Sequence, residues 1–316
     1  MKILFISPRY AGGIGGHANL LSQKLRQHGY DVTLMHVPHI PIKNLKNPSF
    51  AVLGTMKALL SKEKYDIVHA FNVPSAFIMK AVKAKKRVLS VHGVYSEQVD
   101  SLHSSGLSNI VTTAEPKVLK WADKLTTDSA FVKKTYKEKL NLDVELLPSP
   151  IDETRFGEIP QVTKIENQVV YVGRDSYEKG IDILRSIEYK INGKVVYCTN
   201  VPWKEAMTSL KSSSVLVVPS RMESIPWTIK EAFYLKVPVV ATTAGGIPEI
   251  VEDKVTGILV PPNDPTSLLN AINLVLENKE MTRKLIDNAY QHYLNNLTYD
   301  KVLPKYINFY ENLLKN

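Results

Sequence analysis

Two glutamates give this chain its clearest chemical signal. Glu223 and Glu231, eight residues apart, follow the apolar run Val215–Val218, which predicts a buried strand, and Glu231 enters a segment that predicts a helix. Open parallel α/β sheets bind ligands just beyond the carboxyl ends of their strands. There, one carboxylate can bind the paired hydroxyls of a ribose while the other faces a sugar ring. The alternative is two solvated acids at the start of a helix, which the helix dipole favours.

Two basic residues occupy a similar strand-to-helix turn earlier in the chain. Arg174 follows the predicted strand Gln168–Val172 and Gly173, and Lys179 precedes Gly180 at the start of the next helix. Both cations could converge on one pyrophosphate and stabilise a departing nucleoside diphosphate through charge-assisted hydrogen bonds. Either residue alone would be an ordinary surface cation.

Glycine pairs mark two further turns. Gly15 and Gly16 open the first helix, where glycine permits close backbone approach and free N–H groups attract a diphosphate. Their spacing does not match a dinucleotide fingerprint, and no acidic residue ends the second strand, which disfavours a nicotinamide site. Gly245 and Gly246 suggest a second close approach to a ligand. A plain tight turn is the alternative in both places.

Among the histidines, only His92 is a candidate for contact with a ligand. His92 ends the predicted strand Arg87–His92, where it could hydrogen-bond a sugar hydroxyl or be structural. The sequence contains no Asp-x-Asp, and His36 and His39 lack nearby companion ligands, so we expect no metal site. No nucleophile elbow of the Gly-x-Ser-x-Gly type is present either.

Composition indicates a soluble globular protein with an uneven charge. The 316 residues are 44% hydrophobic and 22% charged, and the single cysteine, Cys198, fits a reducing compartment and a place in the core. No segment approaches about 18 uninterrupted apolar residues, so we expect a cytoplasmic location. Residues 1–150 carry 21 Lys and Arg against 11 Asp and Glu, whereas residues 151–316 carry 19 against 20. The basic first half is either a solvated surface or a surface for anionic lipid or a phosphorylated acceptor, with nucleic acid disfavoured.

Strands and helices alternate along the whole chain. This alternation predicts parallel strands with crossover helices, and it restarts after Pro148-Ser149-Pro150. We therefore expect an α/β fold of two doubly wound Rossmann-like domains facing a cleft. The expected parts are an acceptor-binding domain (1–150), a nucleotide-sugar-binding domain (151–297) and a final helix (298–316) that crosses back to the first domain.

Several motifs in order resemble the family 4 retaining glycosyltransferases, also called glycosyl transferases group 1, which have the GT-B fold. The motifs are Gly12-Gly13-Ile14-Gly15-Gly16-His17, His92-Gly93, Gly173-Arg174 with Lys179-Gly180, Pro219-Ser220 with Glu223-x7-Glu231, and Gly245-Gly246-Ile247-Pro248-Glu249. The likeness covers nearly the whole chain. It departs from the family at Ser149-Pro150-Ile151-Asp152, where Asn-Gly-x-Asp is common. It also departs at Asn72, which stands where the family often has a second histidine after the one at His69.

The resemblance implies a role for each candidate. Arg174 and Lys179 would bind the donor diphosphate. Gly173 and the backbone of Gly15 and Gly16 would assist them. Glu231 would hold the ribose. The groups expected around the donor sugar are Glu223, His92, Ile225, Pro226, Trp227, Gly245, Gly246 and Ile247.

It also implies the overall reaction. A sugar would pass from a UDP-sugar or GDP-sugar to a hydroxyl or phosphate acceptor, with retention and without metal or cofactor. The acceptor would be a lipid-linked or cell-surface glycan precursor, reached at the cytoplasmic membrane face through contact of the basic first domain with anionic lipid. Two alternatives are a catalytically silent nucleotide-sugar-binding subunit of a glycosylation complex and a sugar-nucleotide epimerase of the same fold.

Overall fold

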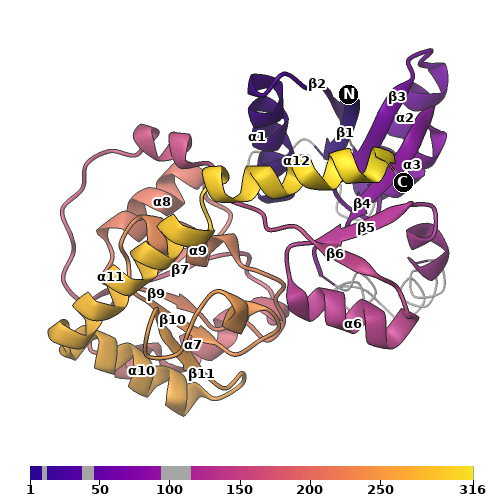
Figure 1. The fold of residues 1–316 in the computed structure, drawn as a ribbon. Helices are drawn as coiled ribbons and strands as arrows, with labels where there is room; N and C mark the ends of the chain where they lie inside the picture. Colours follow the sequence, from indigo (N-terminus) through magenta and orange to yellow (C-terminus); the bar gives the residue numbers. More distant parts are fainter. Residues whose placement is uncertain (9–12, 38–45, 94–114, 316) are drawn as a thin grey trace. The chain divides into compact units, whose positions relative to one another are not determined.

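The chain divides into two compact units, each built on a parallel sheet. The computed structural model describes residues 1–8, 13–37, 46–93 and 115–315 (Figure 1). Unit 1 consists of Met1–Ser149 and Tyr299–Asn316, and unit 2 of Pro150–Thr298. Each unit is an α/β Rossmann-like domain, as the alternation of elements predicts. No helix within the described ranges is long and apolar enough to cross a membrane.

Unit 1 has a six-stranded sheet in the order β2-β1-β3-β4-β5-β6. All pairings are parallel, with Ile3 opposite Val32 on one side and Ile67 on the other. The strands are β1 Lys2–Pro8, β2 Asp31–Val37, β3 Tyr65–Ala70, β4 Ala84–Ser90, β5 Lys124–Thr127 and β6 Val144–Leu146. The helices are α1 Gly13–Gln27, α2 Lys46–Leu60, α3 Ser75–Ala81, α6 Ala130–Leu140 and α12 Tyr299–Lys315.

Unit 2 has a five-stranded parallel sheet in the order β11-β10-β9-β7-β8. Its strands are β7 Gln168–Val172, β8 Lys194–Cys198, β9 Val215–Val218, β10 Val239–Thr242 and β11 Ile258–Val260. Its α-helices are α7 Ile181–Ile187, α8 Trp203–Ser212, α9 Trp227–Tyr234, α10 Pro265–Glu277 and α11 Lys279–Asn296. Short 3-10 helices lie at η1 Glu153–Glu158, η2 Tyr177–Lys179, η3 Glu188–Lys190 and η4 Ile247–Glu249.

Local signals explain where several helices begin and end. The Ser129 hydroxyl accepts a hydrogen bond from the backbone N–H of Val132 at the start of α6, and Asn141 ends that helix in the left-handed conformation at φ 50°. Asp264 caps α10 in the same way, with Pro265 as its first residue. Gly29, at φ 84°, follows α1 as expected of a terminating glycine. The predicted strand Arg87–His92 was wrong at both ends, since β4 runs from Ala84 to Ser90.

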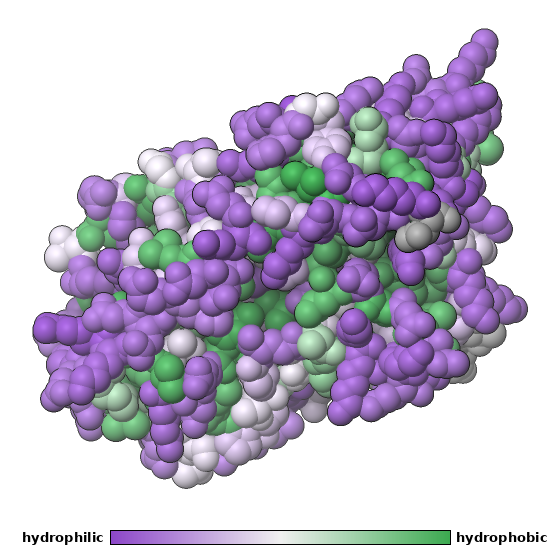
Figure 2. Space-filling view, viewed as in Figure 1, coloured by the Kyte–Doolittle hydropathy of each residue, from purple (hydrophilic) through white to green (hydrophobic). Residues whose placement is uncertain are grey.

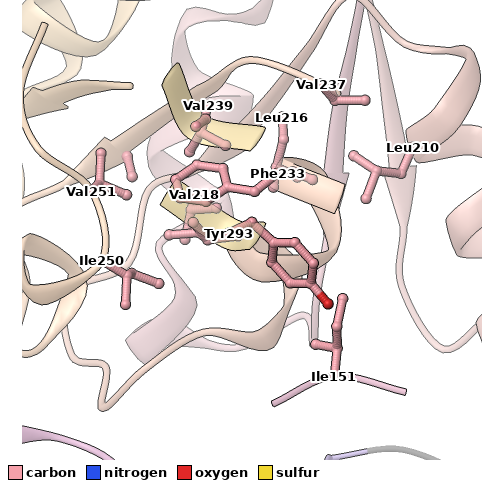
Figure 3. Packing of buried hydrophobic residues seen from close by; sticks show 14 of the residues in the cluster. Ile151, Leu210, Leu216, Val218, Phe233, Val237, Val239, Ile250, Val251 and Tyr293 are labelled. Carbon is pink, nitrogen blue, oxygen red and sulfur yellow. The ribbon is translucent and has the colours of Figure 1, made fainter. Parts of the chain in front are cut away.

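The sheet of unit 2 is buried on both faces, so alternate residues of one strand enter different clusters. Val215 and Val217 of β9 pack with side chains of α7 and α10, whereas Leu216 and Val218 pack with those of α8, α9 and α11 (Figure 3). Such two-sided burial is typical of parallel sheets and explains the uninterrupted apolar run in the sequence. Cys198 lies in the second cluster, as predicted. Hydrophilic residues predominate on the molecular face seen in Figure 2.

Helix α12 is held to unit 1 by apolar packing and by tyrosine hydroxyls. Its buried residues Val302, Leu303 and Leu313 join a cluster with β1 and α1. Tyr306 Oη lies 3.0 Å from Nε2 of His17, which is on α1. Apolar packing and this buried hydrogen bond together hold the last helix of the chain against β1 and α1.

A second tyrosine of α12 reaches a buried histidine in the sheet. Tyr310 Oη lies 2.6 Å from Nδ1 of His69 on β3, and His69 Nε2 lies 2.7 Å from Ser90 Oγ on β4. Ser90 Oγ in turn lies 2.7 Å from Thr126 Oγ1 on β5. Both ring nitrogens of this fully buried histidine are therefore satisfied.

We expect acidification to destabilise unit 1 through His69. Burial first, then the nearby His17 and His92, hold the pKa of His69 well below 6.5. The unfolded chain binds more protons than the folded chain below about pH 6.5, so the stabilising contribution is complete above that pH and is lost as the pH falls. The expected loss is up to about 1.4 kcal/mol per pH unit from this residue.

Urea unfolding of the full chain between about pH 7.5 and about pH 5.5 measures this slope. A His69→Gln variant should show a shallower pH dependence than the parent. The exposed His28→Gln should retain the parental slope. Identical slopes for the parent and His69→Gln would contradict the assignment.

Candidate functional site

The strand order of unit 2 creates a switch point between β7 and β9. From β7 the chain moves outward to β8 on one side and then returns to form β9 on the other. The chain therefore leaves β7 and β9 in opposite directions, and open α/β sheets bind their ligands at such a switch point. Gly173, Arg174 and Lys179 follow β7, and Glu223 follows β9.

An ion pair joins these two loops. Lys179 Nζ contacts Glu223 Oε2, and the two side chains are only 22% and 12% exposed. Partial burial weakens solvent screening, so this pair is stronger than an ordinary surface salt bridge. The lysine predicted for the diphosphate and the glutamate predicted for the sugar are therefore neighbours in the structure.

Arg174 pairs with a different carboxylate. Its Nη2 lies 3.0 Å from Oε1 of Glu178, and the Arg174 side chain is 63% exposed. Glu178 is buried, and neither of its carboxylate oxygens accepts a hydrogen bond of good geometry, although the ionic contact with Arg174 is short. The two cations thus flank the same turn, η2, but contact different acids.

Arg221, which the sequence did not single out, fastens the loop after β9 to η2 and α7. Its Nη1 and Nη2 each lie 2.7 Å from a carboxylate oxygen of Asp182, and Nη1 also donates to the backbone oxygen of Tyr177 at 2.7 Å. The hydrogen bond from Arg221 lowers the pKa of Asp182. The backbone N–H of Arg221 donates a hydrogen bond to the backbone oxygen of Glu178 at 2.8 Å. These bonds fix the loop that carries Glu223 relative to the one that carries Lys179.

Two glycines allow the same loops to pack closely. A Cβ atom on Gly180, at φ 65°, would lie 2.0 Å from the backbone oxygen of Pro219. A Cβ atom on Gly245, at φ 56°, would lie 1.8 Å from the backbone oxygen of Glu223. Gly246 donates its N–H to that oxygen at 3.3 Å. The Gly245-Gly246 turn therefore approaches the backbone of Glu223 as closely as glycine permits.

Glu231 occupies a separate, buried position in α9. Its Oε1 accepts a hydrogen bond of 2.8 Å from Nε1 of Trp203, and the guanidinium carbon of Arg155 lies 3.9 Å from the centre of the Trp203 ring. Burial raises the pKa of Glu231 above its usual range, and the Trp203 hydrogen bond and the charges of Arg155 and Lys230 offset only part of this rise. Neither Trp203 nor Arg155 was predicted, although Trp203 begins the helix that follows β8.

The remaining predicted residues of unit 2 divide into core and loop. Ile225 and Ile247 are buried in the hydrophobic cluster with α8, α9 and α11, so their side chains contribute to packing. Pro226 is the N-cap of α9 and Trp227, partly buried, is its first residue. Only Trp227 presents a partly exposed side chain among these four.

Three predicted site residues lie in unit 1. Gly15 and Gly16 fall in the first turn of α1. His92 lies two residues beyond β4, and its Nδ1 is 3.4 Å from Oδ1 of Asp128. Asp128 Oδ2 accepts a hydrogen bond of 2.6 Å from the Ser149 hydroxyl. Asp128 thus orients His92 at the carboxyl end of the sheet, and this acid was not predicted.

Replacing Gly245 with alanine should destabilise unit 2. The new methyl group would strike the Glu223 oxygen, and the left-handed backbone is unfavourable for alanine, so we expect a loss of about 1–3 kcal/mol. Urea unfolding followed by tryptophan fluorescence measures the change. Gly157→Ala is the matched control, because no atom lies within 4 Å of its Cβ position. Equal stabilities for the two variants would contradict the close contact.

Comparison with known proteins identifies the family. A model described as Glycosyltransferase Family 4 matches residues 11–155, and one described as Glycosyl transferases group 1 matches residues 183–292. An uncharacterized glycosyltransferase of Methanocaldococcus jannaschii is 22% identical, with 98% of each chain covered.

Solved structures show the same fold. Sucrose-phosphate synthase from Thermosynechococcus elongatus matches with a TM-score of 0.80 and 20% identity, over 99% of each chain. Anabaena HepE in complex with UDP-glucose matches with a TM-score of 0.70 and 17% identity, over 99% of this chain and 100% of that one. Together the two family models span well over half of the sequence. The chain belongs to the family 4, group 1 glycosyltransferases and has their GT-B fold.

Proposed function

We propose that this glycosyltransferase moves a sugar, with retention, from a UDP-sugar or GDP-sugar to a hydroxyl or phosphate acceptor. The Lys179–Glu223 pair carries the proposal, because it places a cation and a carboxylate at the switch point where Rossmann-like sheets bind nucleotides. The UDP-glucose complex of Anabaena HepE, a protein of the same fold, supports a nucleotide-sugar donor.

In this proposal Lys179 and Arg174 bind the donor diphosphate. The Lys179 ammonium has three N–H donors, so it can contact Glu223 and still donate to phosphate oxygens. The exposed Arg174 guanidinium can rotate about its long side chain and add a bidentate contact. Gly173, which directly precedes Arg174, is assigned to the same diphosphate site, and backbone N–H groups of Gly15 and Gly16 assist from the first turn of α1.

Glu231 is assigned to the ribose hydroxyls. One of its oxygens accepts the Trp203 hydrogen bond, which leaves the other oxygen to accept from a ligand. Trp203 and Arg155 also favour the charged carboxylate against the cost of its burial. An oriented carboxylate oxygen is what a pair of ribose hydroxyls requires.

The donor sugar is assigned to Glu223, His92, Trp227 and the turn Gly245–Ile247. Glu223 is oriented by Lys179, and its backbone is fixed by Gly246. His92 is oriented by Asp128. For Ile225, Pro226 and Ile247 the proposal involves their backbone and the shape of the loop, since the side chains are buried.

The proposed reaction needs no protein nucleophile. The acceptor oxygen attacks the anomeric carbon on the face from which the phosphate leaves, so a glycosidic bond forms as the carbon–phosphate-oxygen bond breaks. The acceptor proton passes to the departing phosphate oxygen, and the products are a glycoside and a nucleoside diphosphate. Lys179 and Arg174 stabilise the negative charge that grows on the diphosphate. No metal or cofactor takes part in this scheme.

The acceptor is proposed to be a lipid-linked or cell-surface glycan precursor at the cytoplasmic membrane face. The excess of positive charge in residues 1–150, 21 basic against 11 acidic residues, supports an anionic acceptor or surface.

A thermal-shift panel of UDP, GDP, ADP, CMP and their sugar conjugates, with EDTA present, tests the donor site. A ligand at about 100-fold excess over its Kd adds about 2.7 kcal/mol of stability, so one nucleotide should raise the melting temperature by several degrees. Lys179→Ala should abolish this shift and lower turnover at least 100-fold, because a transition-state contact is lost. Lys190→Ala, an exposed lysine of the same unit, should change neither. No shift with any nucleotide would contradict the proposal.

The products of the same assay separate the alternatives. An epimerase would release a changed sugar nucleotide without needing an acceptor. A silent subunit would bind the donor but give no product with any acceptor. If the nucleotide raises the melting temperature in EDTA but turnover occurs only after a divalent metal ion is added, metal independence is contradicted.

Trp203→Phe should weaken nucleotide binding through Glu231. Phenylalanine keeps an aromatic ring beside Arg155 but removes the N–H that orients the carboxylate, so we expect about a tenfold higher Kd, equivalent to a lost hydrogen bond to a charged group. Calorimetric titration with a nucleoside diphosphate and with its 2′,3′-dideoxy analogue measures the effect. The parent should prefer the ribose form, and the variant should prefer it less. Trp121→Phe in unit 1 is the control, and an unchanged preference in Trp203→Phe would refute the role.

A further inference from the structure

Helix α2 of unit 1 is apolar on two opposite faces. One face packs into the unit through Phe50, Gly54 and Ala58, which are spaced by four residues. Gly54 lies so close to α3 that a Cβ atom on it would be 2.2 Å from Cδ1 of Ile78. These contacts are sufficient to hold α2 in unit 1, so apolar residues on its other face are not needed for packing.

The other face is apolar but exposed. Its side chains retain large fractions of their accessible surface: Val52 59%, Leu53 42%, Met56 57%, Leu59 67% and Leu60 82%. At about 100° per residue these five positions fall within one arc of about 120°, opposite the packed face. Scattered apolar residues are ordinary on a surface, but a contiguous stripe marks an interaction site. Phe77 of α3 is also 44% exposed, and hydrophobic atoms are visible at the right-hand edge of Figure 2, where Figure 1 shows α2 and α3.

The chain around this stripe is strongly basic. Residues 32–96 contain ten Lys and Arg but only two acids, Glu63 and Asp66. Glu63 pairs with Lys2 and Asp66 with Lys85. Helix α2 itself contains no acid, and the exposed Lys57, Lys62 and Lys64 lie on it or just beyond its end.

We propose that the exposed stripe of α2 inserts into the interfacial layer of an anionic lipid bilayer, with Lys57, Lys62 and Lys64 contacting the headgroups. Apolar burial and attraction to anionic lipid together give an interfacial helix its affinity. A second copy of the chain fits this surface poorly, because a symmetric contact would bring the same lysines together. The inference rests on the membrane-face location in the proposed function and assigns it to one helix, but it concerns a surface apart from the donor site and does not depend on the transfer reaction.

Co-sedimentation of the full chain with phosphatidylglycerol-containing vesicles tests the proposal. The parent should bind these vesicles and not pure phosphatidylcholine vesicles, and binding should weaken as salt rises. A variant with Val52→Ser, Met56→Ser, Leu59→Ser and Leu60→Ser should partition at least tenfold less. Because these side chains are exposed, its fold should persist, as circular dichroism can verify. The matched control carries Ile165→Ser and Leu274→Ser, which are 50% and 43% exposed in unit 2.

A charge variant tests the second component separately. Lys57→Glu with Lys62→Glu should also lower partitioning at least tenfold, whereas Lys194→Glu in unit 2 should leave it nearly unchanged. Failure of the parent to bind anionic vesicles overturns the proposal. So does equal binding by the parent and the serine variant, or a dimer in light scattering that the serine variant converts to a monomer. The nucleotide-induced thermal shift should be the same in all these variants, which separates this outcome from a failure of the proposed transfer function.

Discussion

Burial of both faces of a parallel sheet is the constraint on which the site of unit 2 depends. Because β9 is apolar throughout, β7 is apolar after Gln168, and both strands are covered on both sides, exposed polar groups have no place along their length. They are confined to the loops at the carboxyl ends. The strand order then makes β7 and β9 neighbours, so that their loops lie side by side at the switch point where such sheets bind ligands. Lys179 and Glu223 occupy the loops that this topology brings together.

Topology alone would leave those loops loosely placed, and the structure fixes them by bonds between backbones. Glycine at 180 and 245 lets each turn approach a neighbouring carbonyl more closely than any side chain would allow. Arg221 adds a bidentate ion pair and two carbonyl contacts, one through its guanidinium and one through its own N–H. The Lys179–Glu223 contact is therefore formed between supports that are already rigid, which reduces the entropy lost when a ligand is bound.

The sequence predicted most of the architecture because its signals are local. The apolar run Val215–Val218 matches β9 to the residue, and the Ser129 and Asn141 caps define α6. The glycines in the first turn of α1 are helical although helix propensity argues against glycine, so local propensity does not indicate the first residue of this helix. β4 ended earlier than the sequence pattern suggested, since Val91 is as buried as the strand residues before it but lies outside the strand.

The site was only partly predictable because its key contacts are made between distant segments. Lys179 and Glu223 could each be selected from a strand-end position, but their pairing spans 44 residues. Trp203, Arg155 and Arg221 escaped prediction because a single tryptophan or arginine has no distinguishing local pattern. Their roles follow only from geometry: the indole N–H directed at Glu231, and the guanidinium placed between two turns.

The same reasoning explains why α12 belongs to unit 1 although it follows unit 2 in the chain. Its apolar stripe could pack on many surfaces, but Tyr306 and Tyr310 need partners for hydroxyls that are fully buried. His17 and His69 provide them, on α1 and β3. On another apolar surface the Tyr306 and Tyr310 hydroxyls would be buried without these partners, at a cost of about 1–3 kcal/mol each. Apolar packing thus stabilises the docked helix, and the tyrosine–histidine hydrogen bonds select α1 and β3 as the surface on which it packs.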